Sequence, residues 1–251
     1  MSRELKGIYT IWLREVTKFS RERILFVSAL VTPMLWLVIF GGGMGVSLRS
    51  GLITSEYKSF IFPGIVGMTL LFSSIRSGFS IIWDREFGFL KEILVAPISR
   101  VSVVLGKALG GATTALIQGV ILLFLSFISG IYLAPGQLVI LLPLMFLISI
   151  GFNAFGLAMA SLIKNFDGFQ TVMSFVNMPV FFLSGALFPL ESYPGWLKTI
   201  SLMDPLTYGV DAMRKVILNE GIFPFYYDLS VLLAFAGTML IITSVLFSIK
   251  K

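Results

Sequence analysis

The segment WDREFGFLKEILVAPISR, residues 83–100, is a charged stretch between two long apolar runs of the chain. Wound as a helix, it separates an apolar side from a charged side, with Glu86 as the exception. Pro97 ends that helix, because proline has no amide hydrogen and crowds the preceding turn. The helix could lie on lipid headgroups, or it could dock a soluble partner through its apolar ridge and its charges. The apolar side consists of Phe87, Leu90, Ile93 and Leu94, and the charged side of Asp84, Arg85, Lys91 and Glu92.

The side chains that most catalytic and metal sites need are missing from the sequence. It contains no histidine and no cysteine, which excludes nucleophile–histidine pairs, histidine-based metal sites and disulfides. The string VVLGKALGG lacks the first glycine of a phosphate-binding loop, and Ala108 follows Lys107 where serine or threonine is required. Carboxylates are almost absent from the apolar runs, so a proton or sodium relay is not supported. We expect a non-catalytic chain, in which any active transport takes its energy from another chain.

Composition places this chain in a membrane. Of its 251 residues, 57% are hydrophobic and 13% charged, whereas about a quarter are charged in an average soluble domain. The mean hydropathy is +0.95, and several apolar runs exceed the roughly 20 residues that cross a bilayer as a helix. The pI of 9.6 does not indicate a nucleic-acid partner, because the basic residues cluster at the ends of the apolar runs.

The order of the apolar runs predicts an all-α integral membrane protein with six transmembrane helices in one domain, residues 1–251. Residues 1–23 are basic with apolar residues at helical spacing, which predicts an amphipathic helix on the membrane surface. A signal peptide would have a shorter charged region and a shorter apolar core. The predicted spans are residues 24–46, 60–83, 101–131, 138–163, 169–188 and 229–249, with a cytoplasmic helix at 84–98 and an outer helical stretch at 189–228.

The distribution of lysine and arginine predicts the orientation. Of the 19 basic residues, 13 fall on the side that holds both termini and the loops at 84–107 and 163–168. Five fall on the other side, and Arg76 lies inside a predicted span. Because cytoplasmic loops are enriched in these residues, we expect a multi-pass protein of the cytoplasmic membrane with both termini in the cytoplasm.

Single residues inside the spans carry weaker signals. Arg76 lies about two turns from the cytoplasmic end of its span, and we interpret it either as snorkelling to the interface or as lining a pathway. The pair Gly106 and Gly110, like Gly41 and Gly45, has the small-xxx-small spacing of close helix packing, which we expect within one subunit.

The outer stretch has a helical pattern of its own. Asp211 and Lys215 stand four residues apart, in the favourable order for a helical ion pair. The stretch is either an ordinary interfacial loop with an aromatic belt or a set of short helices that dip into the outer leaflet, and about 40 residues is long for a passive connection.

Two motifs resemble the type-2 membrane-spanning subunits of ATP-binding-cassette (ABC) exporters. The first is the charged segment quoted above. The second is NMPVFFLSGALFPLESYPGWLKTISLMDPLTYGVDAMR, residues 177–214. Its Ser-Gly-x-x-x-Pro, Pro-x-Trp and Asp-Pro-Leu-x-Tyr patterns and its terminal Arg are similar to the drug-exporter and nodulation-factor-exporter branch.

This resemblance implies a permease that works with a separate ABC ATPase subunit and a second permease copy or a related permease, among membrane lipids. ATP and Mg would bind to the ATPase, and this chain would bind no cofactor. The substrate would be hydrophobic or amphipathic, such as a drug or a lipid-like molecule. Alternatives are a polysaccharide or glycolipid exporter and, from another class, a membrane scaffold or a channel without an ATPase.

The resemblance also assigns roles to residues. The first motif becomes the coupling helix, in which Gly88 permits close backbone approach and the charges fix register on the ATPase. Its coupling residues are Arg85, Glu86, Phe87, Gly88, Leu90, Lys91, Glu92, Leu94 and Pro97. The outer gate or re-entrant motif is carried by Ser184, Gly185, Pro189, Trp196, Asp204, Pro205, Tyr208 and Arg214.

Overall fold

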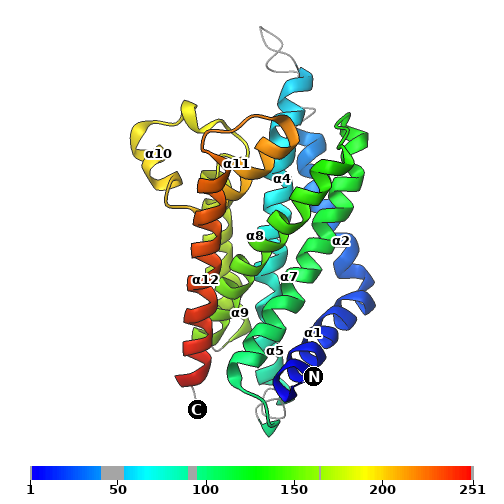
Figure 1. Ribbon diagram of the computed structural model, residues 1–251, viewed down its shortest axis with the longest axis vertical. Coiled ribbons are helices and arrows are strands. Elements are labelled where there is room, and N and C mark those ends of the chain that lie inside the picture. Colours follow the sequence, from blue (N-terminus) through cyan, green and yellow to red (C-terminus); the bar gives the residue numbers. More distant parts are fainter. Residues whose placement is uncertain (1, 41–53, 90–94, 164, 250–251) are drawn as a thin grey trace.

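A computed structural model describes residues 2–40, 54–89, 95–163 and 165–249, and these residues contain helices and no strand. The predicted all-α fold is confirmed. Figure 1 shows an elongated bundle in which the N and C termini lie at the same end. The helices are α1 (Arg3–Arg21), α2 (Arg23–Val38), α4 (Thr54–Ser77), α5 (Phe79–Glu86), α7 (Arg100–Phe124), α8 (Pro135–Leu162), α9 (Phe166–Leu183), α10 (Gly195–Ser201), α11 (Pro205–Leu218) and α12 (Phe225–Ile249), with the short 3-10 turns η2 (Leu125–Ser129) and η3 (Leu190–Ser192).

Local signals set the helix ends. Ser99 caps α7 by accepting a hydrogen bond from the Ser102 amide at 3.2 Å. At α8, Pro135 occupies the first turn, where its missing amide hydrogen costs nothing. At the C-terminal end of α11, Asn219 adopts the left-handed conformation, with φ of 59°, and ends the helix.

Four stretches among the described residues are long and apolar enough to cross a membrane. They are Tyr57–Glu86, Arg100–Phe127, Pro135–Leu162 and Phe225–Ile249. Helices α2 and α9 add 16 and 18 residues of apolar sequence to the same bundle. The count of six spans therefore stays a prediction, whereas a multi-pass helical bundle is established.

The centre of the bundle is α8, which packs against α4, α7, α11 and α12. Its sequence is apolar on all sides, as expected for a helix surrounded by others. Its buried side chains include Met145, Ile148 and Phe152. Helix α11 lies across the bundle at the end opposite the termini (Figure 1).

Two predicted boundaries differ from the structure. The second span is broken at Gly78, where a Cβ would lie 2.6 Å from the carbonyl carbon of Gly156, so that α4 and α8 touch backbone to backbone. The last span begins at Phe225 and not at residue 229, which places Asp228 inside α12. Sequence periodicity gave no sign of the break at Gly78, because this break depends on a contact between distant segments.

Helix α1, predicted as an amphipathic helix on the membrane surface, is amphipathic and also has a packing partner in the bundle. It packs along α7, with Ile11 buried between them. The approach is close, since a Cβ on Gly106 would lie 2.8 Å from Ile11 and one on Gly110 would lie 2.6 Å from Glu15. The predicted packing role of this glycine pair within one subunit is confirmed, while Gly41 and Gly45 lie outside the described residues.

Candidate functional site

The charged segment begins as the end of α5 and then turns. Asp84, Arg85 and Glu86 complete α5, and Gly88 follows with φ of +78°. This conformation corrects the prediction of one unbroken helix over residues 84–98, because a left-handed residue ends an α-helix, although Phe89 and Val95 are helical again. Gly88 also makes no close backbone approach, since a Cβ there would meet nothing within 4 Å. The predicted coupling residues Leu90, Lys91, Glu92 and Leu94 lie outside the described residues.

The described residues of this segment present an apolar surface. Phe87 is 64% exposed, Phe89 50% and Val95 84%, and Trp83 beside them stacks on Phe87. Pro97 is exposed and non-helical, which agrees with its predicted role as a helix terminator. Exposed aromatic and aliphatic side chains grouped in this way are typical of a contact surface for another molecule.

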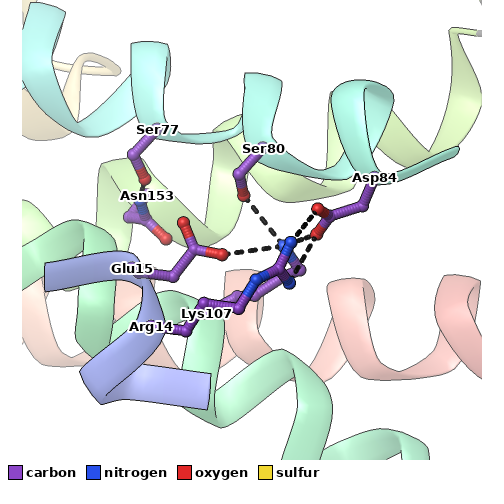
Figure 2. A network of polar contacts seen from close by, with 7 residues as sticks. All are labelled: Arg14, Glu15, Ser77, Ser80, Asp84, Lys107 and Asn153. Carbon is purple, nitrogen blue, oxygen red and sulfur yellow. Dashed lines mark hydrogen bonds and ion pairs between the residues drawn. The ribbon is translucent and has the colours of Figure 1, made fainter. Parts of the chain in front are cut away.

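A buried charge cluster fixes the start of this segment (Figure 2). The Lys107 ammonium, from α7, donates to Asp84 Oδ2 at 2.5 Å, to Glu15 Oε1 at 3.1 Å and to Ser80 Oγ at 3.0 Å. Arg14 forms a two-pronged contact with the same Asp84 carboxylate. The cluster therefore joins α1, α5 and α7.

The charges of the cluster cancel. Two cations, Lys107 and Arg14, face two carboxylates, Asp84 and Glu15, so no net charge is taken out of water. The Lys107 side chain has no exposed surface and that of Asp84 is 4% exposed, whereas that of Arg14 is 39% exposed. A buried ammonium requires partners of this kind, because an unpaired charge there would be strongly destabilising.

Further contacts hold the other parts of the segment. Glu4 of α1 accepts hydrogen bonds from the Ser99 amide at 3.0 Å and from the Ser102 hydroxyl at 2.5 Å. These bonds, led by the one from Ser102, lower the pKa of Glu4 below its usual value. Arg85 donates to the carbonyls of Ala160 and Ile163 at the end of α8, and Arg100 donates to carbonyls of Phe247 and Ser248 at the end of α12. Each guanidinium thus lies at a helix C-terminus, the negative end of the dipole.

The outer motif folds into a unit around Arg214. This side chain is 5% exposed, lies 3.9 Å from the centre of the Phe60 ring, and donates to the Gly185 carbonyl at 2.8 Å. Gly185 has φ of +70°, which forms the turn after α9, and Ser184 beside it is buried. The contact ties α11 to the ends of α4 and α9.

The rest of the outer motif organises the start of α11. Asp204 caps this helix by accepting from the Leu206 amide at 2.9 Å, Pro205 occupies its first turn, and the Tyr208 hydroxyl donates to the Leu202 carbonyl. Burial raises the pKa of Asp204 to about 8. Pro189 opens η3, and Trp196, in α10, is 68% exposed. Helix α10 lies beside the bundle at its outer end (Figure 1).

The cluster around Lys107 was not predicted, and Arg76 was singled out in its place. Arg76 is exposed in the last turn of α4. Lys107 and Asp84 were counted as loop charges, although each stands at the edge of a long apolar run. Two opposite charges at the matching ends of two spans could have suggested a pair, because a charge at membrane depth needs a partner.

The fold and this arrangement define a multi-pass helical membrane protein, in which the described residues form no group of three or more metal-ligating side chains. Residues 6–218 match the family model for ABC-2 type transporters. The chain belongs to the ABC-2 type transporter family, and it is therefore the membrane subunit of an ABC transporter.

Individual relatives agree with this assignment. The chain is 32% identical to the transport permease ycf38 of Cyanophora paradoxa over 213 residues, covering 84% of this chain and 73% of that protein. It is 26% identical to the inner membrane transport permease YadH of Escherichia coli strain K12, covering 91% and 90% of the two chains. It is 27% identical to the doxorubicin resistance ABC transporter permease protein DrrC of Mycobacterium tuberculosis, covering 80% and 73%.

Proposed function

We propose that this chain exports a hydrophobic or amphipathic substrate, driven by a separate ATPase subunit that docks on residues 87–98. A second copy of the chain, or a related permease, completes the pathway. ATP and Mg bind to the ATPase, so the permease itself carries out no chemical step.

The observation that carries this proposal is the high exposure of three apolar side chains that follow α5, namely Phe87 in the turn and Phe89 and Val95, which are helical. Helix α5 ends at the end of the molecule that holds both termini (Figure 1), and the excess of lysine and arginine predicts that this end is cytoplasmic. A soluble ATPase can reach only that side. Exposed aromatic and aliphatic side chains of this kind are typical of the centre of a protein docking surface.

A pull-down from native membranes tests the docking surface. Tagged native chain is purified in mild detergent beside Phe89→Asp, and the partners are identified by mass. The matched control is Tyr132→Asp, which puts the same charge on a residue that is 85% exposed in the turn before α8, at the opposite end of the bundle. We expect an ABC ATPase with the native chain and with the control, and its loss with Phe89→Asp. Equal recovery with all three chains, or no ATPase with any, would contradict the proposal.

The substrate class follows from the low charge of the spans and from one relative. The relative DrrC is named for doxorubicin resistance, which makes doxorubicin the first probe. Inside-out vesicles with the purified complex should take up doxorubicin when ATP is added. ATP-dependent uptake of a lipid-linked sugar, without uptake of doxorubicin, would favour a glycolipid exporter instead.

A further inference from the structure

Three charged side chains meet where α11 is followed by α12, at the end of the bundle opposite the termini (Figure 1). The predicted ion pair between Asp211 and Lys215 forms, with 3.6 Å between Nζ and Oδ2. Asp228, in the first turn of α12, lies at the same distance from the same ammonium. One lysine therefore faces two carboxyl groups, which come from two different helices.

The two carboxyl groups differ in their other partners. Asp211 accepts hydrogen bonds from the amides of Ile222 at 2.9 Å and Phe223 at 3.0 Å, and amide donors stabilise a negative charge. Asp228 has no exposed surface, and among the described residues neither of its oxygens has a hydrogen-bond partner. The Lys215 ammonium, at 3.6 Å from each carboxyl group, is too distant to donate a hydrogen bond to either.

Lys215 cannot neutralise both carboxyl groups. If both were ionised, two negative charges would share one ammonium, whereas in the cluster around Lys107 two cations face two carboxylates. Two carboxyl groups in one site avoid such repulsion by keeping a proton on one of them. Asp228 also lies within hydrogen-bonding reach of Asp211, and two carboxyl groups bond to each other only when one of them is protonated.

Among the described residues, the neighbouring elements supply no other cation to Asp228. Helix α8, which packs along α12, carries no titratable side chain, and the cations of α7 lie toward the opposite end of the bundle. Arg214, also on α11, interacts with other acidic groups, which are Asp211, Glu191 and Glu220. The phenols of Tyr208 and Tyr227 lie beside Asp228 and are neutral at physiological pH. Of the two carboxyl groups, Asp228 therefore has less to stabilise a negative charge.

We propose that Asp211, Lys215 and Asp228 form a proton-binding site, in which Asp228 holds the proton and Asp211 is the carboxylate that pairs with Lys215. The neutral Asp228 donates to Asp211, so that the proton joins α12 to α11. A hollow of about 470 Å³ beside Lys215, lined also by Gln137, Asn219 and Phe225, gives water a route to the site. No part of this site depends on an ATPase, so it stands apart from the proposed function.

The sign of a pH trend tests which form Asp228 takes. Asparagine has the shape of a neutral aspartate, and its amide can donate to Asp211. Thermal midpoints in detergent are compared for Asp228→Asn and its parent, both carrying Asp204→Asn because Asp204 holds a proton of its own. If Asp228 is protonated in the folded chain, only the unfolded state releases this proton near pH 4, and the parent loses stability as the pH rises.

We therefore expect the midpoint of Asp228→Asn to rise relative to its parent between about pH 5 and about pH 7, by roughly 2–4 °C per pH unit. An ionised Asp228 paired with Lys215 predicts the opposite sign, because asparagine would then lose an ion pair that strengthens as the pH rises. A falling difference, or a constant one, overturns the proposal. Asp167→Asn, on an exposed aspartate, should show no trend in the same background.

Infrared spectroscopy detects the proton itself, because a protonated carboxyl group has a C=O band that a carboxylate lacks. The spectrum of the parent minus that of Asp228→Asn should contain this band at neutral pH, and its absence overturns the proposal. In Asp211→Asn the ammonium faces one carboxyl group only, so Asp228 should ionise and the band should disappear, while the asparagine oxygen still accepts from the Ile222 amide. A band that persists in Asp211→Asn overturns the three-residue site. Both experiments use the permease alone, so they remain decisive if no ATPase purifies with it.

Discussion

Lys107 shows how a charged residue can serve the interior of a membrane protein. Its ammonium lies among Asp84, Glu15 and Ser80, and no part of its side chain is exposed. A buried ion pair contributes little net stability over apolar packing of the same volume, but removing one partner is expensive. The cluster therefore fixes which parts of three helices meet. Its effect on the free energy of unfolding becomes large only when one of its members is removed.

Replacing Lys107 with methionine should destabilise the chain strongly. The substitution leaves the Glu15 and Asp84 carboxylates without their shared ammonium, which we expect to cost about 3–5 kcal/mol of folding free energy. Removing a matching negative charge as well, in Lys107→Met with Glu15→Gln, should recover part of this loss. The midpoint of thermal unfolding in detergent measures both, with Lys198→Met, on an exposed lysine of α10, as the control. Equal midpoints for Lys107→Met and the control would contradict the assigned role of the cluster.

Asp204 should make stability depend on pH in the direction opposite to most aspartates. Burial raises its pKa in the folded chain from 3.8 to about 8, so the folded state holds a proton that the unfolded state releases near pH 4. Its contribution to stability is therefore present below about pH 4 and is lost as the pH rises toward 8.

The variant Asp204→Asn isolates this effect, because asparagine keeps the capping oxygen for the Leu206 amide but cannot ionise. We expect its thermal midpoint to rise relative to the native chain between about pH 5 and about pH 9. Asp167→Asn, on an exposed aspartate at the start of α9, should show no such trend. A difference for Asp204→Asn that is constant with pH would rule out the proton on Asp204.

At the scale of elements, glycines decide how closely the helices meet. On α7, Gly106 and Gly110 face α1, whereas Gly111 faces α4 and α8. A Cβ on Gly111 would overlap the side chains of Asn153 and Ser77, which are hydrogen-bonded to each other (Figure 2). Helix α7 thus packs on two sides so closely that there is no room for a side chain at these three glycines.

Two glycine substitutions should therefore have opposite effects. Gly111→Ala forces a methyl group into a filled polar contact, which we expect to cost about 1–3 kcal/mol. Gly237→Ala, in α12, meets nothing within 4 Å and should stabilise by up to about 1 kcal/mol through helix propensity. Thermal midpoints in the same detergent compare the two variants. No loss for Gly111→Ala would mean that α7 does not pack on Asn153 and Ser77 as described.

Hydropathy and helix signals were enough to predict most elements. The apolar runs at 101–131 and 138–163 correctly predicted helices where α7 and α8 lie. They could not predict the break at Gly78 or the packing of α1 on α7, since both follow from contacts between segments far apart in the chain. The charge cluster was missed for the same reason. In the sequence, each of its members looks like an ordinary charge at the membrane interface. Only the packing of α1, α5 and α7 brings these charges together.

At the scale of the whole molecule, the orientation in the membrane is a prediction that two observations support. Both termini lie at one end of the bundle (Figure 1), and the sequence predicts 13 of the 19 lysine and arginine residues on the side that holds both termini. Short loops rich in these residues stay in the cytoplasm, so the end with α10 and α11 should face outward. With this orientation, the proposed docking surface would lie on the side where ATP is available.

Because the native chain has no cysteine, single substitutions can report this orientation directly. Ser2→Cys and Ile249→Cys place a thiol at exposed positions near each terminus, and Tyr132→Cys places one in the exposed turn before α8. A membrane-impermeant maleimide should label the first two only in inside-out vesicles, and the third only in right-side-out vesicles. Split labelling of the two terminal positions would require an odd number of spans. Labelling of all three in the reverse sense would place residues 87–98 outside, where no ATPase could drive them.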